Sequence, residues 1–152
     1  MKSPLEILQA ILSDPTNPDV VNTLVAHDAT FVSLSYYDPE LQKIMPWAGT
    51  GTGPSSIITA FLGVRRFWTN ESFDIRETLE SEDKAAIFGS LTLRSTTLGK
   101  VATSPFAILA KVRDGQVIFM QFLENTFATT GTFRTGGKAT FHSNPDGPEV
   151  TL

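Results

Sequence analysis

One carboxylate, Glu124, stands near the end of an apolar run typical of a β-strand, QVIFMQFLENTF (residues 116–127). Side chains alternate between the two faces of a strand, so Glu124 shares a face with Met120 and Phe122. If this face lines a closed pocket, loss of solvent raises the pKa of the carboxyl group and suits it to proton transfer near neutral pH. If the strand has reached the rim of the sheet by Glu124, the carboxylate is solvated instead.

Two further groups could assist such a carboxylate as hydrogen-bond donors. Tyr37 ends the strand predicted over residues 30–37 and would offer a phenol at the mouth of a pocket, although packing within the sheet is the commoner role of tyrosine. Asn125 directly follows Glu124 and carries an amide donor.

The other titratable side chains have simpler explanations. His27 is expected near the C-terminus of the second predicted helix, where the helix dipole favours an imidazolium, so a structural role is favoured over general-base chemistry. His142 lies in a polar segment and is expected to be solvated. Arg65 and Arg66 lie late in the third predicted helix and are expected to extend into solvent or pair with acidic groups, although one of them could bind an anionic ligand.

The stretch PWAGTGTGP (residues 46–54) has glycines at every second position before a predicted helix, as a phosphate-binding loop would. It lacks the Gly-Lys-Ser/Thr of a Walker loop, and Pro54 stands where a dinucleotide fingerprint needs glycine. The later strands are also joined by tight turns, whereas a nucleotide-binding parallel sheet needs helices between its strands. We therefore expect a turn into the helix, in which glycine allows a positive φ.

Three helices are predicted from capping residues and helical spacing. Ser3, Pro4 and Glu6 form a capping-box pattern that begins the first helix, and this helix should stop at Asp14. The second helix follows Asn17. The third covers residues 54–68, behind Pro54 at its first position.

Strands are predicted wherever the hydrophobic period is two. These runs are residues 30–37, 71–80, 84–98, 101–113 and 116–127. Residues 38–53 are expected to be irregular because Pro39 and Pro46 interrupt them. This order predicts an α+β fold, a cone-shaped roll of three N-terminal helices on a strongly curved, mostly antiparallel sheet that encloses a pocket. Residues 1–135 are expected to form one domain, and residues 136–152 a polar tail that is ordered only if something holds it.

Composition excludes several classes of protein. The 152 residues carry a net charge of −4 with 12 Lys and Arg and no basic cluster, so nucleic acid is not an expected partner. Glu6 and Gln9 interrupt the N-terminal apolar stretch, which argues against a signal peptide or a membrane span and predicts a cytoplasmic protein. The absence of cysteine excludes disulfides and thiolate ligands, and no acidic cluster predicts a metal.

Two segments carry a family resemblance: the loop PWAGTGTG before a helix and the run RDGQVIFMQFLENTFATTGTF (residues 113–133). Together they resemble the SnoaL-like, ketosteroid isomerase-like branch of the nuclear transport factor 2-like superfamily, across about residues 3–130. The last strand of that branch commonly ends in an Asp-Thr-like step, whereas this chain has Asn125 and Thr126.

The resemblance implies an apolar pocket, an outer sheet face that pairs with a second subunit, and no cofactor. It also implies that the Glu124 face points inward. The catalytic candidates are then Glu124, Tyr37 and Asn125, and the predicted ligand-binding residues are Ser33, Trp47, Phe61, Met120, Phe122 and His27.

Known chemistries of the superfamily are only partly compatible with this chain. Alignment with ketosteroid isomerase places Ser33 at the position of its catalytic aspartate and Ala107 near that of its oxyanion acid, which disfavours steroid isomerisation. The Arg-x-Asp of limonene epoxide hydrolases is absent. Two hypotheses remain: a cofactor-free enzyme that transfers a proton next to a carbonyl group of a small hydrophobic molecule, and a non-catalytic module that binds a hydrophobic ligand or partner.

Overall fold

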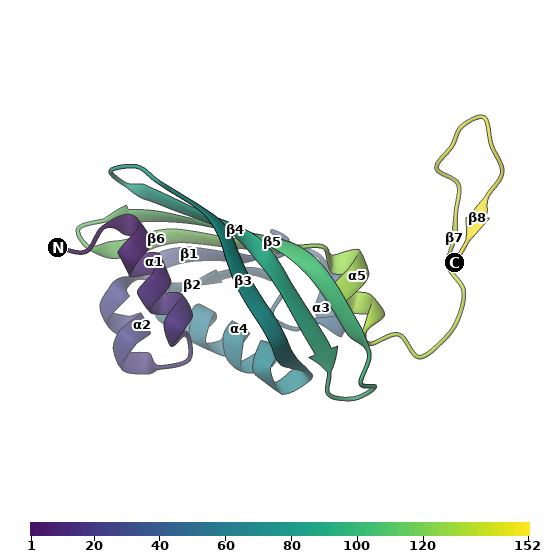
Figure 1. Ribbon diagram of the computed structural model, residues 1–152, viewed down its shortest axis with the longest axis horizontal. Coiled ribbons are helices and arrows are strands. Elements are labelled where there is room, and N and C mark those ends of the chain that lie inside the picture. Colours follow the sequence, from purple (N-terminus) through teal and green to yellow (C-terminus); the bar gives the residue numbers. More distant parts are fainter.

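The computed structural model describes all residues, 1–152 (Figure 1). Its strands are β1 (Val25–Ser33), β2 (Gly49–Thr52), β3 (Trp68–Glu80), β4 (Lys84–Ser95), β5 (Val101–Arg113), β6 (Gln116–Glu124), β7 (Thr140–Phe141) and β8 (Val150–Thr151). Its helices are α1 (Pro4–Ser13), α2 (Pro18–Leu24), α3 (Pro39–Ile44), α4 (Gly53–Phe67) and α5 (Thr126–Gly131). The first six strands form one sheet in the order β2-β1-β6-β5-β4-β3.

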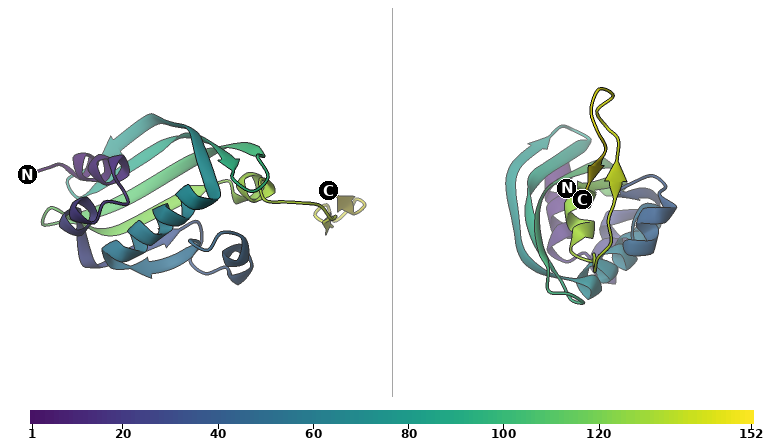
Figure 2. Two further views of the ribbon diagram at one scale, coloured as in Figure 1. Left: turned by 90° about the horizontal axis from the view of Figure 1, so that it is seen from below. Right: turned by 90° about the vertical axis from the view of Figure 1, so that its right-hand side faces the viewer.

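Only one pair of neighbours in this sheet, β1 and β6, is parallel. Helices α1, α2 and α4 lie against one face of the sheet (Figure 2). Their buried side chains, such as Ile7, Leu8 and Ile57, meet the inward side chains of the sheet, such as Ile108 and Met120, in one core. The predicted α+β roll is confirmed, although the sheet is not strongly curled.

The caps of the first two helices are as predicted. The Ser3 hydroxyl accepts a hydrogen bond from the Glu6 amide at 3.2 Å, and the Glu6 carboxylate accepts one from the Ser3 amide at 2.8 Å. The Asn17 side chain accepts a hydrogen bond from the Asp19 amide at 3.0 Å and begins α2. No helix is long and apolar enough to cross a membrane, since the longest, α4, has 15 residues.

The prediction that residues 38–53 are irregular was wrong. Pro39 begins α3, because proline fits the first turn of a helix, and the Asp38 carboxylate caps it by accepting a hydrogen bond from the Leu41 amide at 2.9 Å. The glycine run then forms β2, which pairs antiparallel with β1.

The turn expected between the glycine run and the next helix is confirmed at Gly53, whose φ is +77°. A Cβ at Gly53 would lie 2.6 Å from the carbonyl oxygen of His27, so only glycine lets the two backbones approach this closely.

Strand β1 begins earlier than predicted. Val25 pairs with Val117 of β6, and this sheet pairing overrides the helical spacing that extended the second predicted helix to His27. His27 therefore lies exposed on a strand, and its predicted place at a helix C-terminus was wrong. The strand ends at Ser33, because Leu34 adopts a positive φ of 68°.

Strand β6 ends at Glu124, three residues before its predicted end, because Asn125 caps α5 through a hydrogen bond from the Ala128 amide at 3.3 Å. Simple alternation also fails at Ile118, which is left unpaired in a bulge between Val117 and Phe119. The bulge turns Val117 into the core, although alternation places it on the outer face.

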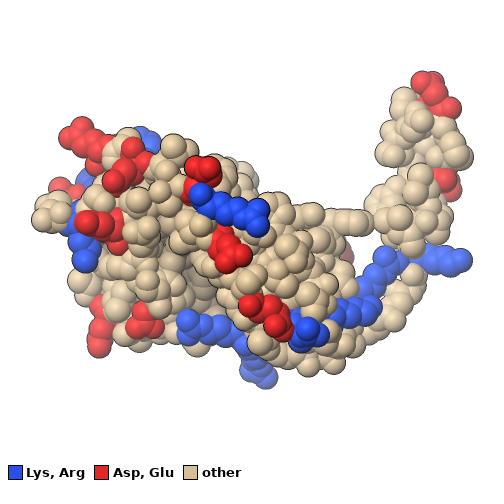
Figure 3. All heavy atoms as spheres, viewed as in Figure 1, with Lys and Arg blue, Asp and Glu red and all other residues tan.

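Residues 136–152 fold back as the β7–β8 hairpin, which stands away from the rest of the molecule in Figure 1 and in the left view of Figure 2. The Arg134 guanidinium holds its base by donating to the carbonyl oxygens of Gly137 at 2.7 Å and Leu152 at 3.4 Å. Basic side chains lie at this base, whereas acidic ones lie at the tip and part-way along the hairpin (Figure 3).

Candidate functional site

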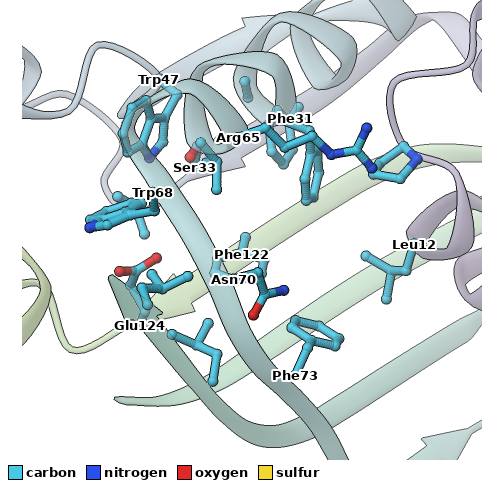
Figure 4. A pocket seen from close by; sticks show the side chains of 17 residues that line it. Leu12, Phe31, Ser33, Trp47, Arg65, Trp68, Asn70, Phe73, Phe122 and Glu124 are labelled. Carbon is cyan, nitrogen blue, oxygen red and sulfur yellow. The ribbon is translucent and has the colours of Figure 1, made fainter. Parts of the chain in front are cut away.

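A cavity of about 330 Å³ lies between α4 and the inner face of the sheet (Figure 4). Twelve of its seventeen lining residues are hydrophobic, and six of these are aromatic: Phe31, Trp47, Phe61, Trp68, Phe73 and Phe122. The polar side chains on the wall are Ser33, Arg65, Asn70 and Glu124. A cavity with this wall fits a small, largely apolar molecule that presents a few polar groups.

The sheet fixes the position of Glu124 from both sides. On one side, Glu124 pairs with Phe106 of β5, and the amide of Asn125 donates to the buried Ser104 hydroxyl at 2.8 Å. On the other side, the amide of Leu34 donates to the carbonyl oxygen of Phe122 at 2.9 Å. Hydrogen bonds of its neighbours thus flank the last residue of β6 on both sides.

The Glu124 carboxylate is short of partners. Its Oε2 atom is buried and has no hydrogen-bond partner. Burial raises the pKa of the Glu124 carboxyl group above that of a free glutamate, and the nearby Thr129 side chain opposes this rise without cancelling it. A carboxyl group in this setting exchanges its proton closer to neutral pH than a surface glutamate does.

Aromatic rings close the end of the cavity near Glu124. The Trp47 ring meets Phe67 and Trp68 edge to face, each at a centroid distance of 5.1 Å. It lies on α4 at Gly63, where a Cβ would be 3.0 Å from the ring. The Trp68 indole N–H donates to the Thr132 hydroxyl at 2.8 Å and points away from the cavity. The Trp47 nitrogen lies on the side of its ring nearer Ser33 (Figure 4).

Three phenylalanines stack along the inner sheet face. Phe106 lies between Phe73, at a centroid distance of 4.3 Å, and Phe122, at 5.9 Å. Gly89 of β4 leaves the space for them, because a Cβ there would lie 2.7 Å from the Phe106 ring. The two outer rings of this stack, Phe73 and Phe122, line the cavity.

Five of the predicted site residues meet on the cavity wall: Ser33, Trp47, Phe61, Phe122 and Glu124. One carboxylate oxygen of Glu124 is buried. The structure therefore disfavours the alternative in which Glu124 lies at the rim of the sheet and is solvated.

The other predicted site residues do not line the cavity. Met120 is fully buried in the core beneath it. Tyr37 is 76% exposed, because β1 ends before it and Asp38 already caps α3. The Asn125 side chain caps α5, and His27 is exposed on β1.

Sequence reasoning missed the contribution of β3, which brings Trp68, Asn70 and Phe73 to the wall. These residues share a face only because the pairing with β4 shifts between Asn70 and Ser72. The alternation of side chains along a strand puts Asn70 on the same face as Trp68, so the sequence could have identified Asn70. The same alternation puts Phe73 on the opposite face. No group of three or more histidine or acidic side chains lies together as a metal site would require.

Two curated proteins are similar in sequence over 152 residues. Patulin synthesis protein F of Aspergillus clavatus is 36% identical, with 96% of this chain and 77% of that protein covered. Patulin biosynthesis cluster protein F of Penicillium expansum is 35% identical, with 96% and 76% covered. No model of a known protein family matches the sequence.

Solved structures share the fold at low identity. An NTF2-like protein of Burkholderia thailandensis has a TM-score of 0.73 at 16% identity, with 88% of this chain and 99% of that chain covered. TerC, crystallised with polyporic acid, has a TM-score of 0.68 at 21% identity, covering 85% and 96%. A Mesorhizobium loti protein proposed to be a SnoaL-like polyketide cyclase has a TM-score of 0.59 at 11% identity, with 78% of this chain and 93% of that chain covered. The fold that the predicted superfamily implies is therefore confirmed.

Proposed function

The chain belongs to the family of the patulin synthesis F proteins, and we propose that it is a cofactor-free enzyme that transfers a proton next to a carbonyl group of a small hydrophobic molecule. The names of these relatives support a role in the synthesis of a small molecule. The NTF2-like fold, with an apolar cavity inside, supports the same class of ligand.

The observation that carries the proposal is the carboxylate of Glu124 on an otherwise apolar wall, with a buried oxygen that no group of the protein satisfies. Leaving such an oxygen without a partner destabilises a fold by about 1–3 kcal/mol, so the arrangement is costly unless a ligand uses it. A structural carboxylate would be paired or hydrogen-bonded.

In the proposed reaction, ionised Glu124 accepts a proton from the carbon next to the carbonyl group. The electron pair of the broken C–H bond moves to the carbonyl oxygen, which becomes an enolate. Where a C=C bond is conjugated with the enolate, the electron pair returns from the oxygen through this bond to its far carbon, protonated Glu124 gives the proton to that carbon, and the carbonyl group re-forms. In this proposal Ser33 and Trp47, which both line the cavity, donate hydrogen bonds to the enolate oxygen and take the roles first predicted for Tyr37 and Asn125.

A binding module is the second candidate, and one observation favours it. Glu124 is the only acidic side chain on the wall, and no histidine accompanies it as a second proton carrier. Such a module would use Glu124 to accept a hydrogen bond from its ligand, without turnover.

A homodimer through the outer sheet face belongs to the same proposal. Phe88, Ala107 and Leu123 lie side by side across β4, β5 and β6 on that face, and the first and last are 46% and 43% exposed. An apolar row of this kind is typical of a sheet that pairs with another subunit.

The test is hydrogen exchange in D₂O, with a panel of cyclic ketones and enones as probes and mass spectrometry as the readout. The wild-type protein is expected to introduce deuterium next to the carbonyl group of at least one probe. Glu124→Gln is expected to lower that rate by about 10²–10⁴-fold, the usual contribution of a general acid–base group. The matched control is Glu82→Gln, at an exposed turn, which should leave the rate unchanged.

If the Glu124→Gln variant exchanges probe hydrogens as fast as the wild type, the catalytic role of Glu124 is refuted. If no probe exchanges but the same compounds bind and Glu124→Gln weakens them, the binding module is the correct candidate.

A further inference from the structure

We infer that Arg65 forms an anion-binding subsite at the end of the cavity opposite Glu124, so that the natural ligand carries a carboxylate or another anionic oxygen group in addition to its carbonyl. The inference rests on the proposed function, because it takes the same cavity as the site of substrate binding. It narrows the substrate class from hydrophobic carbonyl compounds to hydrophobic acids.

Arg65 is the only basic side chain on the wall. Figure 4 shows its guanidinium and the Glu124 carboxylate at opposite ends of the cavity, with Phe122 and Asn70 between them. The two opposite charges are therefore separated by a largely apolar stretch, with Asn70 as its polar side chain, that would hold the body of a ligand.

The guanidinium of Arg65 is held in place without being neutralised. Its Nη1 donates to the Thr16 hydroxyl, in the link between α1 and α2, at 2.6 Å. The ion pairs of the fold use Lys43, Lys84 and Arg94, and none uses Arg65. A guanidinium has five N–H donors in a fixed plane, so most of those on Arg65 are free for an anionic oxygen.

The position of Glu124 gives the ligand a direction. An anionic group is repelled by an ionised Glu124 and attracted by Arg65, so it is expected at the Arg65 end of the cavity. The neutral carbonyl end then lies beside Glu124, where the proposed proton transfer takes place. Asn70, on the wall between the two ends, can offer its amide to either part of the ligand.

The chain provides a matched control in Arg66. It is the next residue of α4, has the same charge and is exposed like Arg65, but it does not line the cavity. Any effect of general charge on an acidic ligand would appear equally in Arg65→Gln and Arg66→Gln.

The experiment measures the binding of 1-naphthoate and its neutral methyl ester, followed by quenching of tryptophan fluorescence, since Trp47 and Trp68 lie on the wall. Wild-type protein is expected to bind the acid more tightly than the ester. Arg65→Gln should weaken binding of the acid about tenfold and leave the ester unchanged, the effect of losing one charge-assisted hydrogen-bonded contact. Arg66→Gln should change neither.

Thr16→Val provides a second variant that keeps the charge. It removes the hydroxyl that orients Arg65 and should weaken binding of the acid by a smaller factor than Arg65→Gln. Glu124→Gln should bind 1-naphthoate at least as tightly as the wild type, whether or not it exchanges hydrogens. The anion subsite and the catalytic role of Glu124 can therefore fail independently.

The inference is wrong if the acid does not bind, if the ester binds as tightly as the acid, or if Arg65→Gln and Arg66→Gln weaken the acid equally.

Discussion

Both faces of the sheet carry hydrophobic side chains, but those on the inner face are buried and those on the outer face are partly exposed. On β5, Ile108 is 1% exposed against the helices, while its neighbour Leu109 stays partly exposed on the outer face. On β6, Leu123 faces outward at 43% exposure, and the next residue, Glu124, faces the cavity. Hydrophobic composition alone does not distinguish the faces. Their partners do, since the inner face is covered by helices of the same chain and the outer face is uncovered.

The largest expected difference between the faces is in stability. Ile108→Ala should lower the free energy of unfolding by about 3 kcal/mol, because it leaves a void in a packed core. Leu109→Ala, one residue away, should lower it by less than about 1 kcal/mol. Denaturant unfolding of the two variants measures this difference. Equal losses would mean that the outer face is also packed within the monomer.

The next effect concerns the outer face alone. Leu123→Asp should weaken the proposed dimer by about 2 kcal/mol, because it places a charge in the apolar row of Phe88 and Ala107. Leu62→Asp is the control, since Leu62 is 53% exposed on α4, on the helical side of the molecule. Sedimentation at several concentrations measures the dissociation. A wild-type protein that stays monomeric throughout would contradict the dimer.

A smaller effect follows from the one charge on the inner face. Because the pKa of Glu124 is raised by folding, its contribution to stability is complete below the unfolded value near 4.5 and is lost as the pH rises through the folded value. Glu124→Gln should therefore be more stable to unfolding than the wild type at pH 8, with the difference shrinking toward pH 4. A variant that is less stable than the wild type at pH 8 would show that the ionised carboxylate is satisfied.

The smallest effect on stability is expected at the β7–β8 hairpin, which belongs to neither face of the sheet. We propose that residues 1–135 are the folding domain, so removal of residues 136–152 should change the free energy of unfolding by less than about 0.5 kcal/mol. The hairpin meets the domain mainly through the hydrogen bonds of Arg134. A large loss of stability in the shortened chain would place the hairpin within the domain.

The sequence correctly predicted those features of the structure that depend on residues close together in the chain. The cap at Ser3, the turn at Gly53 and the shared face of Phe122 and Glu124 follow from residue type and period. The exposed place of His27 does not, because it depends on pairing between β1 and β6, which lie far apart in the chain.

The cavity wall was predicted only in part for the same reason. Phe73 reaches it through a shift in the pairing of β3 with β4, and Val117 enters the core through a bulge. Bulges depend on how two strands fit together, and the hydrophobic period of one strand does not reveal them.

The most direct test of the central claim is the titration of Glu124 itself. Protein labelled with ¹³C in its glutamate carboxyl groups is titrated by NMR, and the Glu124→Gln variant identifies the signal. We expect this carboxyl group to titrate with a pKa above the ordinary 4.5, because burial disfavours its ionised form. A pKa at or below that value would mean that Glu124 is solvated or paired, and would contradict its proposed role in proton transfer.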